Sequence, residues 1–294
     1  MKNAYIIYHP AEAEKNKNFI QMFQKAGKKY GIEFSLCYPD PSAEKGIIIC
    51  ETESRGKDCA GKWYDTEPDL VLNRTRDPQI SRMYEKKGIP VFHSANMVEL
   101  ANNKYKMNEY FREHLPAHIT EKKWCPDTIL WTASKDKVDD GFERGVIKSV
   151  EGHGGNEVFL AEDRENWEKS LLNRPVVLQE KIECHSRDLR VYVLFGEIYC
   201  VMLRQGTRDF RSNFSLGGSV QKTELTQEQK EYVRCFIRCL PEYDRGMYSV
   251  DFLPLDDGTL LFDEVEEMVG CRMLYQYTDR DIVDDYVAGL AQQK

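Results

Sequence analysis

The first 95 residues alternate short apolar runs with longer segments whose apolar residues recur every three or four positions. The longer segments, residues 12–30 and 78–87, have the period of helices with one apolar face. The short runs have the length of buried strands, and they are Tyr5–Tyr8, Ile32–Leu36, Gly46–Cys50 and Leu70–Leu72. Strands that alternate with helices predict an open, mostly parallel sheet. Since ligands bind beyond the carboxyl ends of such strands, Arg74 and Arg76 become candidates for binding a substrate.

The pattern of residues 96–183 differs from that of the first part. A helical period over residues 96–115 ends at Pro116, because proline cannot continue a helix. One further helix is predicted near Glu165–Leu172. Four strand-like runs surround it, and they are Thr128–Trp131, Gly145–Lys148, Glu157–Leu160 and Val176–Gln179. This mixture predicts a small central α+β subdomain.

Paired strands dominate from residue 184 to the end of the chain. The segments Leu189–Phe195 and Glu197–Leu203 are separated by a single glycine and predict a hairpin. A helix opened by the capping residue Thr226 comes next, and the pair Tyr248–Leu253 and Thr259–Val265 follows it. We therefore predict a C-terminal subdomain built on an antiparallel sheet.

The chain is thus predicted to be an α/β (α+β) protein of three parts, residues 1–95, 96–183 and 184–294. Its 41% hydrophobic and 31% charged residues are typical of a soluble globular protein. No run approaches the roughly 18 apolar residues of a membrane helix, and no export signal opens the chain, so we expect a cytoplasmic protein without a membrane partner. The net charge of −8 argues against nucleic acid as the main partner. The oligomeric state is left open, a homo-oligomer included.

Nine cysteines are scattered along the chain without a CxxC pair. In a chain without an export signal, this spacing predicts reduced thiols and neither a disulfide framework nor a structural zinc site. Cys235 and Cys239 lie one helical turn apart, and we interpret them as core-facing residues of a helix.

A glycine-rich loop follows the predicted strand that ends at Lys148, and it contains Gly152, Gly154 and Gly155. Backbone N–H groups of such a loop can approach phosphate oxygens, and the lysine adds a positive charge. The lysine precedes the glycines, so this is not a Walker A loop, and a flexible hairpin turn is the alternative interpretation.

Charged residues also cluster at three strand ends. Gln179–Ile182 follows an apolar strand and can offer backbone groups to an adenine, although a solvated strand end has the same sequence. Asp188 and Arg190 share one face of a strand. Residues 208–213 contain arginines, whose guanidinium groups make paired hydrogen bonds with phosphate or carboxylate. A salt-bridged surface remains the alternative for both arginine clusters.

Three carboxylates form the most specific pattern of the chain. Glu264 and Glu266 are two residues apart in one strand and therefore share a face, and Asp251 joins them if its strand is the neighbour. Carboxylates that converge on a mostly buried face repel one another unless a cation is present. Oxygen ligands of this kind suit Mg²⁺ or Mn²⁺. A solvent-exposed face is the alternative.

In this order and spacing, these segments resemble the ATP-grasp superfamily, in particular its RimK-like branch, the ribosomal-protein glutamate ligase group. The resemblance rests on Lys148 with Val150–Gly152, Gln179–Glu180, Asp188–Arg190, Asp209–Asn213 with Gly217–Gly218, and the carboxylate pattern. It implies an ATP-dependent ligase that converts a carboxylate into an acyl phosphate and joins it to an amine of an amino acid, peptide or protein, with release of ADP and phosphate. It also implies that the central subdomain is a lid.

The resemblance also implies roles for single residues. Asp251, Glu264 and Glu266 are expected to hold two Mg²⁺ or Mn²⁺ ions, and Arg190 and Arg211 to stabilise the transferring phosphoryl group. Contacts with ATP are expected from Lys104, Lys148, Gly152, Gly155, Glu180, Lys181, Ile182, Asp188, Arg211, Ser212 and Asn213. Arg74 and Arg76 are candidates for recognising the substrate carboxylate, with solvated loop arginines as the alternative.

Three residues depart from the family pattern. Glu266 stands where asparagine is usual, Glu157 replaces the last glycine of the loop, and Asn103 replaces an aspartate before Lys104. The added carboxylate at position 266 favours a metal ion but repels a triphosphate. Two other functions therefore stay open, an ATP-binding regulatory module without turnover and a phosphotransferase with the same fold.

Overall fold

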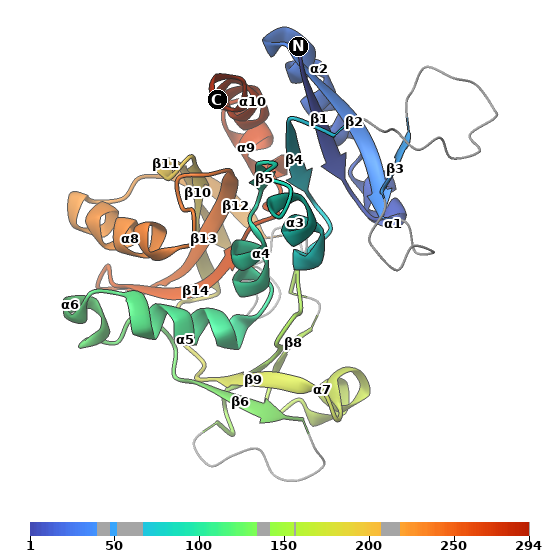
Figure 1. Cartoon of the computed structure of the whole chain (residues 1–294). Helices are drawn as coiled ribbons and strands as arrows, with labels where there is room; N and C mark the ends of the chain where they lie inside the picture. Colours follow the sequence, from blue (N-terminus) through green and yellow to red (C-terminus); the bar gives the residue numbers. More distant parts are fainter. Residues whose placement is uncertain (40–47, 52–66, 134–141, 156, 207–217, 294) are drawn as a thin grey trace. The chain divides into compact units, whose positions relative to one another are not determined.

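The computed structural model describes residues 1–39, 48–51, 67–133, 142–155, 157–206 and 218–293, which form two compact units (Figure 1). Unit 1 comprises residues 1–99, 244–247 and 280–294, and unit 2 comprises residues 100–243 and 248–279. We describe each unit by itself. Within the described residues, no helix is long and apolar enough to cross a membrane, and the cytoplasmic location stays a prediction.

Unit 1 is built on a five-stranded sheet in the order β3-β2-β1-β4-β5. Parallel pairing joins β1 to β2, β1 to β4 and β4 to β5, whereas β3 pairs antiparallel with β2. The strands are β1 (Lys2–Ile7), β2 (Ile32–Pro39), β3 (Ile48–Glu51), β4 (Leu70–Asn73) and β5 (Val91–Phe92). The alternation of strands and helices had predicted this open α/β sheet.

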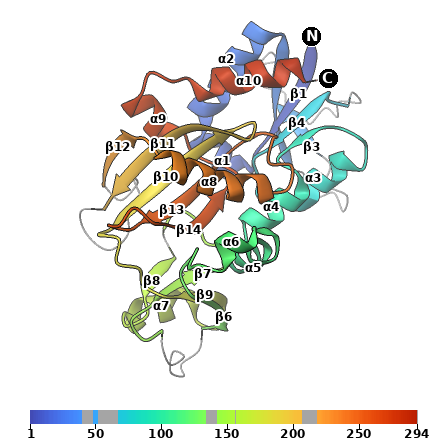
Figure 2. The ribbon, with the colours of Figure 1, turned by 90° about the vertical axis from the view of Figure 1, so that its left-hand side faces the viewer.

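Helices cover both faces of this sheet. Helices α2 (Lys17–Tyr30) and α10 (Ile282–Gln292) lie side by side (Figure 2), and the Phe23 ring meets the Tyr286 ring edge-on at 5.9 Å. The other face packs against α3 (Pro78–Glu85) through a core cluster that includes Tyr84 and Val71. The last helix of the chain therefore completes the core of unit 1, although the predicted three-part division had grouped it with the C-terminal sheet.

A second five-stranded sheet, in the order β12-β11-β10-β13-β14, forms the C-terminal part of unit 2. Its strands are β10 (Arg187–Leu194), β11 (Glu197–Gln205), β12 (Ser219–Thr223), β13 (Met247–Pro254) and β14 (Leu260–Glu266). Helices α5 (Lys104–His114) and α8 (Gln227–Cys239) pack against it through an aromatic cluster. The Phe111 ring lies 5.2 Å from that of Phe236 and 4.8 Å from that of Phe262.

The central part of unit 2 is a four-stranded antiparallel sheet in the order β6-β9-β7-β8. Its strands are β6 (Thr128–Thr132), β7 (Val146–Ser149), β8 (Val158–Leu160) and β9 (Pro175–Gln179). Helix α7 (Arg164–Leu171) covers it through Trp167 and Leu171, which are fully buried against Ile147 and Val176. This is the small α+β subdomain that the sequence predicted.

The boundaries of the helices differ from the prediction more than the number and order of the main elements do. The helix predicted over residues 12–30 is divided at Asn16 into α1 (Pro10–Lys15) and α2. The helix predicted over residues 96–115 is divided into α4 (Ala95–Ala101) and α5, because the Asn103 side chain caps α5 by accepting from the Lys106 N–H. The pattern did not predict β12, α6 (Ala117–Thr120) or α9 (Arg272–Tyr277).

Candidate nucleotide and metal site

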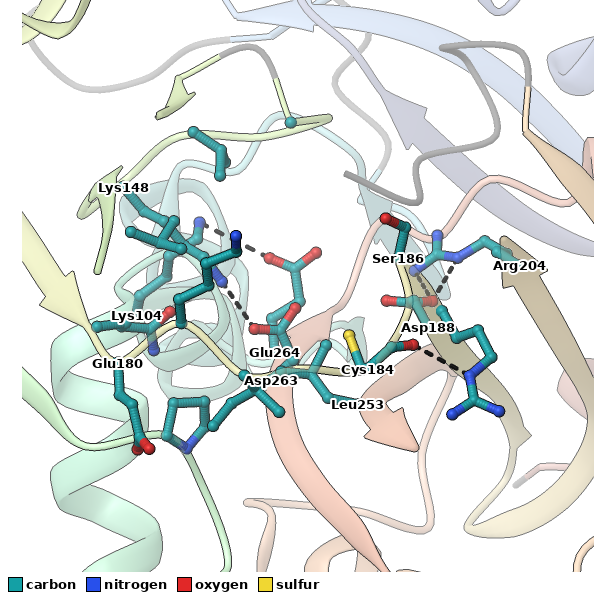
Figure 3. Close-up of a pocket in the computed structure, with 18 of the residues that line it drawn as sticks. Lys104, Lys148, Glu180, Cys184, Ser186, Asp188, Arg204, Leu253, Asp263 and Glu264 are labelled. Atoms are coloured by element: carbon teal, nitrogen blue, oxygen red, sulfur yellow. Dashed lines mark hydrogen bonds and ion pairs between the residues drawn. The ribbon is translucent and has the colours of Figure 1, made fainter. Parts of the chain in front are cut away.

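A cavity of about 290 Å³ in unit 2 is lined by residues of both of its sheets (Figure 3). This volume lies near the lower end of the range for small-molecule sites. The predicted ATP-binding residues that line the cavity are Lys104, Lys148, Gly152, Gly155, Glu180, Lys181, Ile182 and Asp188. The three others, Arg211, Ser212 and Asn213, lie outside the described residues. Segments far apart in the sequence thus meet at one cavity, while contact of these residues with ATP stays a prediction.

Lys104 reaches the cavity from the first turn of α5. Its Nζ donates to the carbonyl oxygen of Gly152 at 2.5 Å, and Glu264 Oε2 lies 3.8 Å away. The Lys104 backbone N–H also donates to the carbonyl of Val150 at 3.1 Å. Lys104 therefore holds the glycine-rich loop through neutral acceptors, and its only ion-pair distance within the described residues is long.

Lys148 reaches the cavity from the end of β7. Its Nζ donates to Asp263 Oδ1 at 2.8 Å, and both side chains are 14% exposed. Burial lowers the pKa of Lys148, but Asp263, Glu264 and the nearby Asp188 outweigh it and raise this pKa above its usual value. Lys148 is therefore positively charged at neutral pH, as a phosphate ligand must be.

The glycine-rich loop is anchored at its far end by a residue that departs from the family pattern. Glu157 accepts from Arg174 Nη1 at 2.6 Å, and Arg174 Nη2 donates to Ser149 Oγ at 3.2 Å. Hydrogen bonds from Arg174 lower the pKa of Glu157. Gly154 and Gly155 have φ values of 67° and 74°, which favour glycine. The loop can therefore turn sharply while Glu157 fixes its base.

Apolar side chains also line the cavity, which adjoins the segment predicted to bind adenine. Val146, Val158 and Leu253 line it together with Ile182. Within this segment, the Ile182 carbonyl accepts from the Cys184 N–H at 3.1 Å, and the Glu180 carboxylate forms an ion pair with Lys123. An apolar slot beside exposed hinge residues suits a planar base.

A buried network of arginines and carboxylates lies on one face of the C-terminal sheet. Arg190 Nη2 donates to Asp251 Oδ2 at 2.6 Å and to Glu266 Oε2 at 2.9 Å. Arg204, which lies opposite Asp188 in the β10/β11 register, donates to Asp188 Oδ1 through Nε at 2.5 Å and to Asp251 Oδ2 through Nη2 at 2.8 Å. Arg190 and Arg204 are therefore held by carboxylates in orientations that the backbone register sets.

Arg204 is a residue that sequence reasoning did not select. Its charge within the apolar strand Glu197–Gln205 could have drawn attention to it. Its role, however, depends on its position opposite Asp188. That pairing follows from the hairpin register, which the sequence pattern did not fix to the residue.

The two buried aspartates of this network have pKa values shifted in opposite directions. Burial disfavours the charged form of Asp251, but Arg190 and Arg204 outweigh it and lower the pKa of this carboxyl. For Asp188, burial is the larger effect and raises the pKa to about 7, although the adjacent Arg204 opposes the rise. Asp251 is therefore the permanently charged centre of the network.

The three predicted metal ligands lie on one face of two neighbouring strands. Asp251 is opposite Glu264, and Ser249 is opposite Glu266, in the antiparallel pair β13/β14. Of the three, Glu264 lines the cavity, whereas Asp251 and Glu266 accept hydrogen bonds from Arg190. The predicted arrangement on the sheet is therefore present.

The donor set fits an oxygen-coordinated divalent cation best at Glu264. Burial is the largest cause that raises the pKa of Glu264, and the carboxylates of Asp263, Asp251 and Glu266 raise it further, while Lys104 opposes them. A cation there would remove this repulsion. As they stand, no three acidic, histidine or cysteine side chains in the described part of the chain are close enough together to hold a metal ion. The metal assignment stays a prediction.

The strand pair β13/β14 contains a bulge that sequence reasoning did not anticipate. Its register shifts after Asp251, so that Phe252 is opposite Phe262 and Asp263 is the extra residue. Asp263 and Glu264, although consecutive, both line the cavity (Figure 3). In a regular strand, two consecutive side chains would point to opposite faces of the sheet.

The candidate substrate residues Arg74 and Arg76 lie in unit 1, after β4. The Arg74 side chain is 8% exposed, donates through Nε to Tyr8 Oη at 3.2 Å and lies 5.3 Å from the centre of the Phe19 ring. Arg76 has a φ of 62°, an uncommon value for a residue other than glycine. Arg74 is thus a buried arginine and not a solvated loop residue, and its role in substrate binding stays a prediction.

Comparisons with known proteins agree with this architecture. Residues 134–290, just over half of the chain, match the RimK-like ATP-grasp domain. The beta-citrylglutamate synthase B of Mus musculus is 33% identical over 267 residues, which are 83% of this chain and 66% of that protein. The N-acetylaspartylglutamate synthase A of Homo sapiens is 29% identical over 248 residues, which are 76% of this chain and 61% of that protein. This chain therefore spans less than the full length of both relatives.

A solved structure shows the same fold at low sequence identity. The D-alanine–D-alanine ligase of Bacillus anthracis, determined with ATP, has a TM-score of 0.62 and 16% identity, over 99% of this chain and 92% of that chain. Its architecture matches the three sheets described above. The chain therefore belongs to the RimK-like ATP-grasp family of ATP-dependent carboxylate–amine ligases.

Proposed function

We propose that the protein activates a carboxylic acid with ATP as an acyl phosphate and joins it to the amine of an amino acid or peptide. The observation that carries this proposal is the single cavity that collects two lysines, a glycine-rich loop, an apolar slot and a cluster of carboxylates and arginines. Such a cavity offers separate places for a base, a triphosphate and divalent cations.

In this proposal the apolar slot of the cavity takes the adenine, beside Lys181 and Ile182. The triphosphate extends toward Lys104 and Lys148, whose ammonium groups replace the Gly152 carbonyl and the Asp263 carboxylate as they contact phosphate oxygens. The loop glycines then present backbone N–H groups to the same oxygens. Arg211, Ser212 and Asn213 are proposed to complete the phosphate contacts.

The charges of the site support two divalent cations. Among the described residues, its buried or half-buried acids are Glu180, Asp188, Asp251, Asp263, Glu264 and Glu266, and its bases are Lys104, Lys148, Arg187, Arg190 and Arg204. The acids already outnumber the bases, so a triphosphate alone would bring further uncompensated negative charge into the cavity. Two Mg²⁺ or Mn²⁺ ions, held by Glu264 with Asp251 and Glu266, would neutralise it and reduce the charge on the γ-phosphate.

The residues of the chain then support a two-step transfer. An oxygen of the substrate carboxylate attacks the γ-phosphorus, the bond to the ADP oxygen breaks, and ADP leaves. The amine nitrogen next attacks the acyl carbon, the bond from carbon to the phosphate oxygen breaks, and phosphate leaves as the nitrogen loses a proton. Arg190 and Arg211 are proposed to stabilise the transferring phosphoryl group, since fixed donors cost no reorganisation at that moment. The backbone N–H of Lys104, which donates to the Val150 carbonyl, would keep the glycine-rich loop at the cavity and help to exclude water.

The substrate class is suggested by the relatives. Both curated relatives described above are named as synthases of glutamate-containing products. We therefore propose glutamate as the first amine to test, and Arg74 and Arg76 as residues that recognise the carboxylate of the acid or of glutamate.

The test is to measure ADP release with Mg²⁺, ATP, glutamate and a panel of carboxylic acids, with hydroxylamine as a second nucleophile. The proposal expects ADP release that requires an acid, and a hydroxamate when hydroxylamine replaces the amine. A stable phosphorylated product without a hydroxamate would favour a phosphotransferase. Tight ATP binding without ADP release in any mixture would favour a regulatory module, which is the function that the contact of Glu266 with Arg190 supports.

A further inference from the structure

Asp263 is a carboxylate of the cavity that takes no part in either proposed transfer step. It is present there because the bulge in β13/β14 adds one residue between Phe262 and Glu264. Without this bulge, the residue before Glu264 would point to the opposite face of the sheet. The bulge therefore places a second carboxylate directly beside the proposed cation ligand.

The partner of Asp263 is the lysine that is proposed to bind phosphate. Lys148 belongs to β7 of the central sheet and Asp263 to β14 of the C-terminal sheet. Their 2.8 Å contact therefore joins the two sheets at the cavity (Figure 3). Both side chains are mostly buried, so solvent weakens this pair far less than a surface pair. By contrast, Lys104 donates to a backbone carbonyl, which leaves no charge behind when the lysine moves.

Moving Lys148 to a phosphate would leave Asp263 buried beside Glu264 without its cation. A buried carboxylate that has lost a cation at 2.8 Å is strongly unfavourable, and a neighbouring carboxylate adds to this cost. Three other bases of the cavity already have partners among the described residues, since Lys104 contacts Gly152, Arg187 contacts Asp256, and Arg204 contacts Asp188 and Asp251. A divalent cation beside Glu264 can take the place of Lys148.

We propose that Asp263 couples divalent-cation binding to nucleotide binding: it holds Lys148 in the nucleotide-free protein and releases it to the phosphates when a cation takes its place. This proposal rests on the proposed function, since it takes Lys148 as a phosphate ligand. It makes Asp263 a positioning residue that acts through Lys148. Because coupling between two ligands is reciprocal, the nucleotide also increases the affinity for the cation.

Binding of the non-hydrolysable analogue AMPPNP by calorimetry, in EDTA and in saturating Mg²⁺, tests the coupling. In Asp263→Asn, Lys148 is no longer held by a charge, so affinity in EDTA should rise about tenfold, within the usual range of coupling between sites. The enhancement by Mg²⁺ should shrink by the same factor. Glu165→Gln is the matched control, because it removes one carboxylate from the 2.8 Å pair with Lys169 on the exposed surface of α7, and it should change neither affinity.

Two results with Asp263→Asn would overturn the proposal. Unchanged affinities in both conditions would mean that Asp263 does not compete for Lys148. A loss of affinity in Mg²⁺ alone would make Asp263 an ordinary cation ligand. Failure of the proposed nucleotide site gives a different result, because then Lys148→Ala would bind AMPPNP as well as the unaltered protein does. Failure of the proposed ligase activity appears separately, as AMPPNP binding without ADP release in any mixture of acid and amine.

The unaltered protein offers a second test in case Asp263→Asn does not fold. Acylation of Lys148 by an N-hydroxysuccinimide ester, quantified by mass spectrometry, should be slow in EDTA, faster with Mg²⁺ alone and slow again with Mg²⁺ and AMPPNP. The exposed Lys169 should react at one rate throughout. A Lys148 rate that Mg²⁺ alone does not change would contradict the proposal.

Discussion

Two polar regions of the molecule hold their arginines in different ways. On the C-terminal sheet of unit 2, Arg190 and Arg204 each contact two carboxylates. At the carboxyl edge of the parallel sheet in unit 1, Arg74 donates to the Tyr8 hydroxyl and lies over the Phe19 ring. A neutral hydrogen bond lies next to it in the chain, from Asn73 Nδ2 to Ser81 Oγ at 2.9 Å.

The difference suggests what each region can bind. Where buried arginines and lysines are already paired with carboxylates, a triphosphate must bring divalent cations with it. An arginine that contacts a hydroxyl and an aromatic ring can also make paired hydrogen bonds with a carboxylate. We therefore expect nucleotide and metal effects from variants in unit 2, and effects on the acid or amine from variants at the edge of the unit 1 sheet.

The largest effect is expected for Lys148→Ala. Removing a fixed donor to the phosphates should lower the turnover number for ADP release by about 100- to 1,000-fold. Circular dichroism should show an intact fold, whereas the unfolding temperature should fall because Asp263 loses its buried partner. Unchanged turnover would show that the nucleotide does not bind in this cavity, and the contrast between unit 1 and unit 2 would then fail.

Glu264→Gln should act next most strongly, through the cation. Loss of the carboxylate that lines the cavity should raise the Mg²⁺ concentration for half-maximal ADP release by about tenfold or more. Titration of ADP release with Mg²⁺ measures this, and Glu165→Gln serves as the control. If the half-maximal concentration is the same in both proteins, the metal assignment is wrong.

Arg74→Ala separates the two regions. Losing a charged hydrogen bond to a carboxylate should raise KM for the acid or for glutamate by about tenfold, while the affinity for AMPPNP stays constant. Arg82→Ala is the control, because Arg82 pairs with Glu99 in the same unit. An equal loss of nucleotide affinity in Arg74→Ala would show that the two regions do not divide the ligands as we propose.

The smallest effect concerns pH. The pKa of Asp188 in the folded protein, about 7, lies above its ordinary value of 3.8. Protonation as pH falls through 7 therefore removes a negative charge from the cavity, and AMPPNP should bind severalfold more tightly in EDTA at pH 6 than at pH 8. The same shift destabilises the fold as pH rises from about 4 to 7, because the native state then holds the extra proton.

Asp188→Asn isolates this pH effect. The phosphate of the ligand itself titrates near pH 6, and the variant should retain the pH dependence that this causes. The pH dependence that Asp188 causes should be lost. Identical pH profiles of the variant and the unaltered protein would show that Asp188 stays ionised throughout.

The sequence predicted those features that depend on local pattern. Apolar periodicity predicted most strands and helices, strand ends with glycines or charges predicted seven residues that line the cavity, and the family resemblance added Lys104. It did not predict the roles of Asp263 and Arg204, because these depend on a register shift in β13/β14 and on the pairing of β10 with β11. Nor did it predict that α10 packs on α2, since one helix pattern does not identify its partner. Such features follow from pairing between distant segments.

The transfer of oxygen from the acid to phosphate tests the central claim most directly. The acid that gives the fastest ADP release, labelled with ¹⁸O in its carboxylate, is incubated with Mg²⁺, ATP and glutamate, and the phosphate is analysed by mass spectrometry. The account predicts phosphate with one ¹⁸O atom, and none of this product with Lys148→Ala. Phosphate that contains only unlabelled oxygen, although ADP is formed, would contradict activation of a carboxylate by this protein.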